Sequence, residues 1–415
     1  MRRIVFLLLA AASALAQRPR YGGTLVVETR QLSFSELGAL TGDTLVREGL
    51  GGTVQPGLAQ TWTYDSSRRR WRFDIRPGVK LHDGSVLTAA AVAAALAPRK
   101  AAAQGESVFI ESASAKLPSE MASAAAVIPG TGPFRSAEPD PAQRILLAAH
   151  DQHWEGRPFV DAIEIRLGRG WKEQLADFEA GTADLVELTP TEYRRQQQRG
   201  RRAWASAATD LIAIAFGRGS PPVQDERVRY GIAAAIDRGP ILNVILQKLG
   251  ESGAGMLPQS VSGYAFLFPA ARDMVRARQY LSPPPAALTF GVDPNDPALR
   301  AVADRVALNV REAGGLLRVQ APGTTDLALV RVPGENQDPP VLLETYARIL
   351  QVPVQRTMPG PEGLFDAERK LLDGGWIVPL CHTSRAYGVS ARLKNWNGTA
   401  RPGWGLEQVW LEAAP

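Results

Sequence analysis

The chain has 415 residues, with 47 Lys and Arg against 42 Asp and Glu, 21% charged residues and 45% hydrophobic residues. This length favours two or three lobes over one compact core, and the ordinary composition argues against a largely disordered chain or a polytopic membrane protein. The small net charge of +5 gives no indication of a nucleic-acid partner, and a single cysteine, Cys381, excludes an internal disulfide and a thiolate zinc cluster.

The first seventeen residues have the order of an export signal. Arg2 and Arg3 form a basic start, residues 4–12 form an apolar run, and residues 14–16 (Ala-Leu-Ala) supply the small-x-small pattern that signal peptidase recognises. The apolar run is far shorter than the ~20 residues that span a bilayer, and no cysteine follows it. We therefore expect a signal peptide at residues 1–16 and a periplasmic protein without a lipid anchor. A buried first helix is the alternative.

The first half of the mature chain alternates short strands with helices. Trp71, Phe73 and Ile75 alternate with charged residues, which is typical of a half-buried strand, and Thr88 is a suitable N-cap for an alanine-rich helix. Residues 99–125 contain few large apolar residues, so a surface excursion is expected there. Strands are expected at 23–27, 59–64, 71–76, 145–148, 163–167, 183–187 and 211–216, and helices at 88–96, 174–180, 228–237 and 241–249.

A run of three prolines at residues 283–285 marks a change of segment, and the alternation then continues. Alternating strands and helices with short connections indicate an α/β protein. The second half is expected to contain strands at 287–291, 317–319, 327–332 and 376–381, and helices at 297–313 and 365–373.

Eight short stretches follow one another in a recognisable order. They are YGGTL at 21–25, PGLAQTW at 56–62, WRFDIRPGVKLHDGSVLTAAAV at 71–92, GTGPF at 130–134, HWEGRP at 153–158, GTADL at 181–185, PPVQDERVRYGIAAAIDRGPI at 221–241 and IVPLCH at 377–382. Together they resemble the family 5 extracellular solute-binding proteins, the dipeptide- and oligopeptide-binding components of bacterial ABC importers. The resemblance implies a bilobed periplasmic-binding fold of type II, peptide-binding class, with a ligand cleft between the lobes.

The resemblance also implies a division of the chain into discontinuous lobes. The chain is shorter than most family members, so the family's small extra subdomain is expected to be reduced. The division is a signal peptide at 1–16, lobe I at 17–50, 135–240 and 378–415, the reduced subdomain at 51–134, and lobe II at 241–377.

A candidate ligand site follows from the same resemblance. In peptide-binding relatives, a strand of the second lobe ends in an aromatic residue, and an acidic residue of the following loop meets the free amino group of the peptide. Here the strand is 327–332 and the loop is 334–339, Gly-Glu-Asn-Gln-Asp-Pro. The alternative is an exposed acidic turn before the Pro-Pro pair. The implied ligand-binding residues are Glu335 at the amine, Asp338 as a second acid, Val332 in the aromatic place, and Met256.

Several other residues are of types that often take part in metal binding or catalysis, but we expect structural roles for them. His150 and His153 are interpreted as a solvated loop rather than as metal ligands, and His82 as part of a turn. Cys381 and His382 are adjacent on a strand, so their side chains should point to opposite faces, and a buried cysteine is expected rather than a nucleophile. The sequence lacks the usual motifs of serine hydrolases, zinc proteases, nucleotide hydrolases and dinucleotide-binding enzymes. No catalytic residue, metal site or cofactor is expected.

The resulting hypothesis is a monomeric binding protein. It would capture a peptide or similar small solute by closure of its cleft and deliver it to the permease subunits of an ABC transporter in the inner membrane. Two alternatives stay open: an exported hydrolase on an α/β scaffold, and a family remnant that acts as a protein-interaction module.

Overall fold

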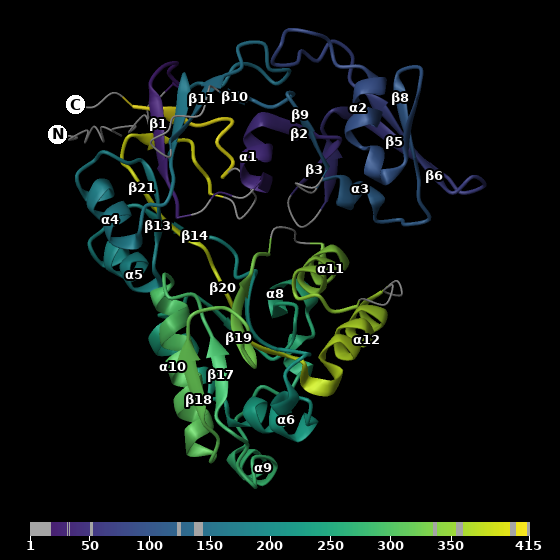
Figure 1. Ribbon diagram of the computed structural model, residues 1–415. Helices are drawn as coiled ribbons and strands as arrows, with labels where there is room; N and C mark the ends of the chain where they lie inside the picture. The colour runs from purple at the N-terminus through teal and green to yellow at the C-terminus, as the bar shows by residue number, and fades with distance from the viewer. Residues whose placement is uncertain are drawn as a thin grey trace, which may run out of the picture.

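A computed structural model describes residues 18–30, 32, 34–49, 53–122, 126–136, 144–334, 338–353, 360–398 and 404–412. The expected cleavage site after Ala16 lies outside these residues. Two lobes, each built on its own sheet, lie one above the other in Figure 1, and a smaller unit extends from the upper lobe. Within the described ranges, none of the helices has the length and apolar character needed to cross a membrane.

The first lobe, the upper one in Figure 1, contains a seven-stranded sheet that is buried on both faces. Strand β1 lies in its middle: Leu25 and Val27 point into one hydrophobic core and Val26 into another. β1 pairs in parallel with both of its neighbours, and the outer strands join antiparallel. In spatial order the strands are β10 (Phe134–Ser136), β11 (Arg144–Ala149), β12 (Ala162–Arg166), β1 (Thr24–Glu28), β13 (Leu185–Leu188), β21 (Ala386–Val389) and β14 (Ala203–Ala205), with helices α1 (Phe34–Thr41), α4 (Trp171–Glu179) and α5 (Pro190–Gln198).

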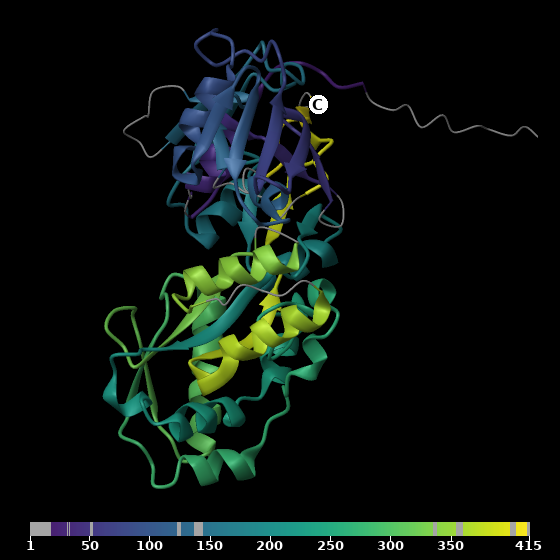
Figure 2. The same ribbon diagram turned by 90° about the vertical axis from the view of Figure 1, so that its right-hand side faces the viewer.

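The second lobe contains a six-stranded sheet between two layers of helices. Figure 2 shows α11 and α12 crossing in front of this sheet. In spatial order the strands are β16 (Gly250–Ser252), β20 (Ile377–Thr383), β15 (Asp210–Phe216), β19 (Leu327–Val332), β17 (Leu288–Gly291) and β18 (Leu317–Gln320). The helices are α6 (Glu226–Ala235), α7 (Arg238–Pro240), α8 (Gln259–Ser262), α9 (Met274–Tyr280), α10 (Pro297–Glu312), α11 (Pro339–Ile349) and α12 (Pro361–Leu372).

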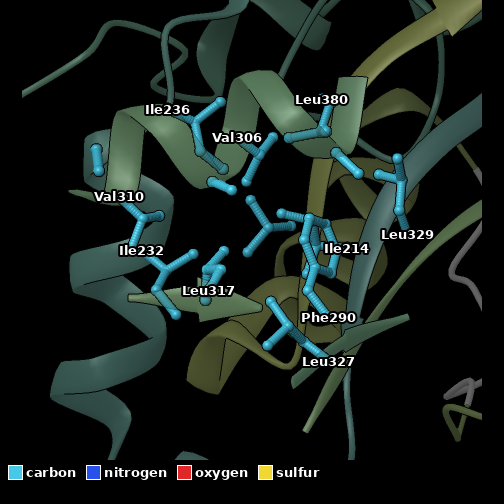
Figure 3. Packing of buried hydrophobic residues seen from close by; sticks show 14 of the residues in the cluster. Ile214, Ile232, Ile236, Phe290, Val306, Val310, Leu317, Leu327, Leu329 and Leu380 are labelled. Carbon is cyan, nitrogen blue, oxygen red and sulfur yellow. The ribbon is translucent and has the colours of Figure 1, made fainter. Parts of the chain in front are cut away.

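The larger core of this lobe lies between the sheet and α10, as Figure 3 shows. Ile214 of the central strand and Phe290 of β17 meet Val306 and Val310, which lie four residues apart on α10. Side chains at this spacing share one face of a helix, which is the pattern that predicted a helix at 297–313. Burying each such aliphatic side chain stabilises the fold by about 1.5–3 kcal/mol relative to exposure, so α10 is held mainly by packing.

The smaller unit is a four-stranded sheet covered by two helices. Thr88 caps the first helix by accepting a hydrogen bond from the Ala91 amide, as expected. The expected surface excursion at 99–125 is wrong, because this segment supplies a hairpin and a helix whose Ile110 and Met121 are fully buried. The strands, in spatial order, are β5 (Ala59–Asp65), β6 (Arg70–Ile75), β8 (Ser107–Glu111) and β7 (Ala101–Gln104), with helices α2 (Ala89–Ala95) and α3 (Leu117–Met121).

Short two-stranded pairs complete the upper half of the molecule. Two of them lie where the smaller unit meets the first lobe, and a third lies near the C-terminus. They are β2 (Gly42–Thr44) with β9 (Val127–Pro129), β3 (Val46–Glu48) with β4 (Val54–Pro56), and β22 (Leu393–Lys394) with β23 (Trp410–Leu411).

The chain passes between the two large sheets twice. It leaves the first lobe between β14 and β15 and returns between β20 and β21, and these crossings lie side by side in Figure 1 and Figure 2. The expected boundaries at 240/241 and 377/378 therefore need correction, because residues 210–240 and 378–383 belong to the second lobe. The physical reason is that β15 is apolar on both faces, so it fits only the middle of a sheet with helices on each side.

Glu368 is one of the ionisable side chains buried inside the second lobe. Glu368 on α12 has no exposed surface, and its Oε1 accepts a hydrogen bond of 2.9 Å from the Leu257 amide. Burial raises the pKa of Glu368 from its ordinary value of 4.5 to about 7.

We expect this carboxyl to make stability fall as the pH rises. Between pH 4.5 and about 7 the folded chain keeps a proton that the unfolded chain has released. The contribution of Glu368 to the free energy of unfolding is therefore complete below pH 4.5 and is lost as the pH rises to about 7. The loss should be about 3 kcal/mol. Glu368→Gln should remove this pH dependence in chemical denaturation across the range, while Glu362→Gln, exposed on the same helix, should keep it. Identical pH profiles for wild type and Glu368→Gln would contradict the prediction.

Candidate functional site

A hollow that is open to solvent and has a cavity volume of about 90 Å³ lies between the two lobes beside the crossing strands. Its walls come from both lobes and from the crossing between them. The first lobe contributes the end of β1 and the N-terminal ends of α4 and α5, the second lobe contributes β19 and the N-terminal end of α10, and residues 383–387 of the crossing close one side. Figure 1 shows α5 directly above α10 at this junction.

Two arginine side chains, one from each lobe, line this hollow. Arg30, which follows β1, stacks its guanidinium over the Trp171 ring at 4.2 Å from the centroid, and its Nε lies 3.4 Å from Glu187 Oε2. On the second lobe, Nη2 of Arg331 lies 3.2 Å from Asp296 Oδ2. The hollow therefore has an arginine and a carboxylate on each side.

A third arginine lies in the crossing itself. The Nε of Arg385 donates to both carboxylate oxygens of Asp210, at 3.2 and 3.1 Å. Asp210 is buried at the first position of β15, and its Oδ1 also accepts from the Gly334 amide at 3.1 Å. This pair ties the two crossing segments together at the base of the hollow.

Three N–H groups of side chains that line the hollow make no hydrogen bond of good geometry, although Arg30 Nε lies 3.4 Å from Glu187 Oε2. They are Nε of Arg30, Nε1 of Trp171 and Nε of Arg331, which are buried atoms without a hydrogen-bond partner among the described residues. Buried donors without partners are uncommon in folded proteins and cost free energy. In this conformation the three atoms have no exposed surface.

The described residues of the predicted site, Val332, Met256 and Asp338, do not line this hollow. Val332 and Met256 belong to one hydrophobic core of the second lobe and have no exposed surface, so in this conformation they are in no position to wall a ligand. Glu335 lies outside the described residues. Its role at a ligand amine stays a prediction.

Asp338 is engaged in structural contacts. It is the N-cap of α11, and its Oδ2 lies 2.8 Å from Nζ of Lys116 in the smaller unit. The alternative, an exposed acidic turn, is wrong for Asp338, which is buried, while residues 335–337 lie outside the described residues. The Pro-Pro pair begins a helix, because proline's fixed φ is suited to the first turn. The ion pair joins the upper half of the molecule to the second lobe, where Figure 1 shows α3 above α11.

The histidines near residue 150 are buried, so their interpretation as a solvated loop is wrong. Nε2 of His153 lies 3.0 Å from the buried Asp43, and His150 and His82 both contact the carbonyl oxygen of Gly132, at 3.2 and 3.0 Å. These partners are distant in sequence and could not be inferred from local spacing. Among the described residues, no group of three or more His, Cys, Asp or Glu side chains is placed to hold a metal ion.

The pair Cys381 and His382 behaves as predicted. Cys381 is buried in the core against α10, and burial raises the pKa of its thiol to about 12. His382 points to the other side, where its Nε2 lies 2.7 Å from the Met256 carbonyl oxygen, and burial lowers its pKa to about 4. The two side chains do not form a nucleophile and base.

Sequence reasoning missed Arg30, Trp171, Arg331 and Arg385 as residues of the hollow. A usable signal was present, since Arg30 follows an expected strand and Trp171 precedes an expected helix. In α/β proteins, ligands bind beyond the carboxyl ends of parallel strands. No known motif surrounds these residues, so they were not predicted as part of a site.

Comparison with known proteins identifies the family. Residues 53–108 and 100–314 match the family described as bacterial extracellular solute-binding proteins, family 5 Middle. The probable ABC transporter periplasmic-binding protein SapA of Escherichia coli is 27% identical over 138 residues, which is 32% of this chain and 25% of that protein. The aligned region thus spans about a quarter of that relative's length.

Solved structures agree over almost the whole chain. The oligopeptide-binding protein AppA of Bacillus subtilis, in complex with a nonapeptide, superimposes with a TM-score of 0.82 at 15% identity, covering 95% of this chain and 100% of that one. NikA of Staphylococcus aureus, in complex with Ni(L-His)2, gives 0.81 at 14% identity, covering 94% and 100%. These likenesses confirm the predicted α/β, bilobed periplasmic-binding fold of type II. Because the family match covers more than half of the residues, the chain belongs to the bacterial extracellular solute-binding proteins of family 5.

Proposed function

We propose that this protein captures a small solute, a peptide or a compound of similar size, in the hollow between its lobes and delivers it to the permease of an ABC importer. The observation that carries the proposal is the position of the hollow. Both lobes supply its walls, and the crossing strands close one side. Binding sites for small molecules occur preferentially at such junctions between domains.

This position also suggests how capture works. A solute bound only to one lobe would leave the relative position of the lobes unchanged. A solute that contacts Arg30 on one side and Arg331 on the other favours the closed form by the free energy of the additional contacts. The closed form is then the one that the permease would recognise.

The chemistry of the relatives supports a small solute without fixing its identity. AppA holds a nonapeptide and NikA holds Ni(L-His)2 in structures that share this fold. We propose a periplasmic location for this protein, on the basis of the family and of the expected export signal at residues 1–16.

Native mass spectrometry of protein purified gently from the periplasm tests the proposal. We expect a population heavier than the apoprotein, which releases an intact small molecule when the chain is unfolded. An exported hydrolase would instead return cleaved products when incubated with the released compound. A family remnant that acts as a protein-interaction module would show the apoprotein mass alone and no mass change with concentrated peptide mixtures, and this result would contradict the proposal.

A further inference from the structure

One ion pair joins the smaller unit to the second lobe. Nζ of Lys116, the residue that precedes α3, lies 2.8 Å from Oδ2 of Asp338, the residue that precedes α11. Among the ion pairs between described residues, the other pair that links the two halves of the molecule is Arg385 with Asp210, inside the crossing. Figure 1 shows α3 above α11, and Figure 2 shows α11 in front of the second-lobe sheet, whose strands β15 and β20 lead into the crossing. The two halves are therefore tied at two separate places.

Lys116 is directed at the second lobe by the contacts of its own unit. Its amide donates to Ser114 Oγ at 3.2 Å, which fixes the backbone at the start of α3. Glu120, one turn further along, is the acid of α3 that could attract the ammonium. Its Oε1 accepts from Ser114 Oγ at 3.1 Å, and its Oε2 lies 3.5 Å from Nη1 of Arg99. The nearby acid is thus engaged by other groups, and Lys116 pairs across the lobes.

Asp338 is held firmly on its own lobe. It is the N-cap of α11, and its two oxygens have different partners: Oδ1 accepts from the Val341 amide at 3.5 Å, and Oδ2 pairs with Lys116. Helix α11 buries Tyr346 in the core of the second lobe, and the hydroxyl of Tyr346 donates to the carbonyl oxygen of Thr209, just before β15. A force on Asp338 therefore acts on the second lobe as a whole rather than on a loose loop.

The two charged groups differ in how far the closed arrangement buries them. The side chain of Lys116 is 52% exposed, whereas that of Asp338 is only 8% exposed. A carboxylate with so little exposure is costly unless a cation pairs with it. Separation of the lobes would withdraw α3 from Asp338 and return both charges to water. The pair therefore favours the closed arrangement, and burial of Asp338 without Lys116 would oppose it.

We propose that Lys116 and Asp338 form a latch that holds the lobes together in the absence of solute. The latch goes beyond the proposed function, because it concerns the resting position of the lobes and not what they capture. Its strength is modest, since one partner is half exposed and exposed pairs shift an equilibrium by about fivefold at most. A latch of this strength leaves the lobes able to open, which a solute requires in order to enter.

The latch also affects affinity. A solute that needs the closed arrangement binds in proportion to the fraction of molecules that can adopt it without help. Loss of the latch should therefore lower the affinity for a solute by no more than the factor by which the ratio of closed to open molecules falls.

Distances between spin labels on the two halves test the latch. Ala103→Cys on β7 and Ile349→Cys at the end of α11 place labels at exposed positions of the smaller unit and the second lobe. The native Cys381 is buried, and burial raises the pKa of its thiol to about 12, so it should stay unlabelled. Co-purified solute is removed by unfolding and refolding, and pulsed electron paramagnetic resonance then gives the ratio of closed to open molecules.

Three variants and a control are compared in this background. Asp338→Asn removes the charge but keeps a good N-cap, so the ratio of closed to open molecules should fall about twofold to fivefold. Lys116→Met leaves the carboxylate without its cation, so the ratio should fall further, on the order of tenfold. The double variant has no carboxylate to bury and should return to the ratio of Asp338→Asn. Arg68→Gln removes a positive charge from a side chain of the same unit that is 68% exposed, and should match wild type.

The order of these ratios distinguishes a latch from a general effect on stability. A double variant that is more open than Lys116→Met would overturn the latch, and so would three ratios equal to that of wild type. One unchanging distance in wild type and in every variant would overturn it as well, because the pair would then control no movement. Each of these results leaves the proposed capture of a solute standing, since that function is tested by the mass of the bound molecule.

Discussion

Replacing Asp184 by asparagine should destabilise the first lobe by about 2–3 kcal/mol, below the range for breaking a fully buried ion pair because the Arg392 side chain is 37% exposed. Asp184 is 1% exposed, and both of its oxygens are fully used. Oδ1 accepts from Ser390 Oγ at 2.7 Å and from Arg392 Nε at 2.6 Å, and Oδ2 accepts from Arg392 Nη2 at 2.6 Å and from the Val26 amide at 3.0 Å. Asparagine would turn one acceptor into a donor that faces these donors.

The position of Asp184 explains the size of the effect. It belongs to the Gly-Thr-Ala-Asp-Leu stretch and stands just before β13. Its contacts hold together β1 and the segment after β21, which are more than 150 residues from it in the chain and neighbour β13 in the sheet. A break here loosens the middle of the sheet rather than its edge.

Chemical denaturation measures the loss of stability, and hydrogen exchange followed by mass spectrometry shows which strands are loosened. Exchange should accelerate in peptides from β1 and β21. The matched control is Asp151→Asn, which also removes a carboxylate from an arginine, at 2.8 Å, but has a side chain 70% exposed. That change should cost less than about 1 kcal/mol. Equal losses for the two variants would show that Asp184 acts as a surface charge.

Most of the fold could be predicted because its signals are local. The residues of α10 repeat at helical spacing, and those of β6 alternate, so each element carries its own pattern. The errors came where a local signal has two meanings. The prolines at 339 and 340 are compatible with a turn or with a helix start, and only the buried cap of Asp338 decides between them. The sequence of the alanines at 101–103 gives no sign that they form an edge strand, which pairs with the buried strand β8 in a hairpin.

The hollow could not be predicted because none of its signals is local. Arg30, Trp171, Arg331 and Arg385 come from four segments that meet only when the chain has crossed between the sheets twice. Each residue alone looks like a surface arginine or an apolar tryptophan. Their common property, a place on the wall of one hollow, exists only in the folded molecule.

The joint between the first lobe and the smaller unit requires a glycine, because it has no room for a Cβ atom. Gly132 belongs to the Gly-Thr-Gly-Pro-Phe stretch, and a Cβ there would lie 2.3 Å from the Gly42 amide nitrogen and 2.4 Å from the Thr41 carbonyl carbon. Both atoms belong to the backbone, so rotation of a side chain cannot relieve the clash. The carbonyl oxygen of Gly132 is also the shared partner of His82 in the smaller unit and His150 in the lobe.

Gly132→Ala should therefore destabilise the protein by about 3 kcal/mol or more, at or above the upper end of the range for overpacking. The damage should be confined to the joint, so hydrogen exchange should accelerate in β2 and β9, while the second-lobe strands β15 and β19 keep their protection. Gly38→Ala makes the same chemical change inside α1, where the added methyl meets its nearest neighbour at an ordinary 3.9 Å. Because alanine favours a helix over glycine by about 1 kcal/mol, that variant should match or exceed wild-type stability. An equal loss of stability in the two variants would contradict the prediction. It would show that the close backbone contact at Gly132 adds no cost beyond that of an alanine in a helix.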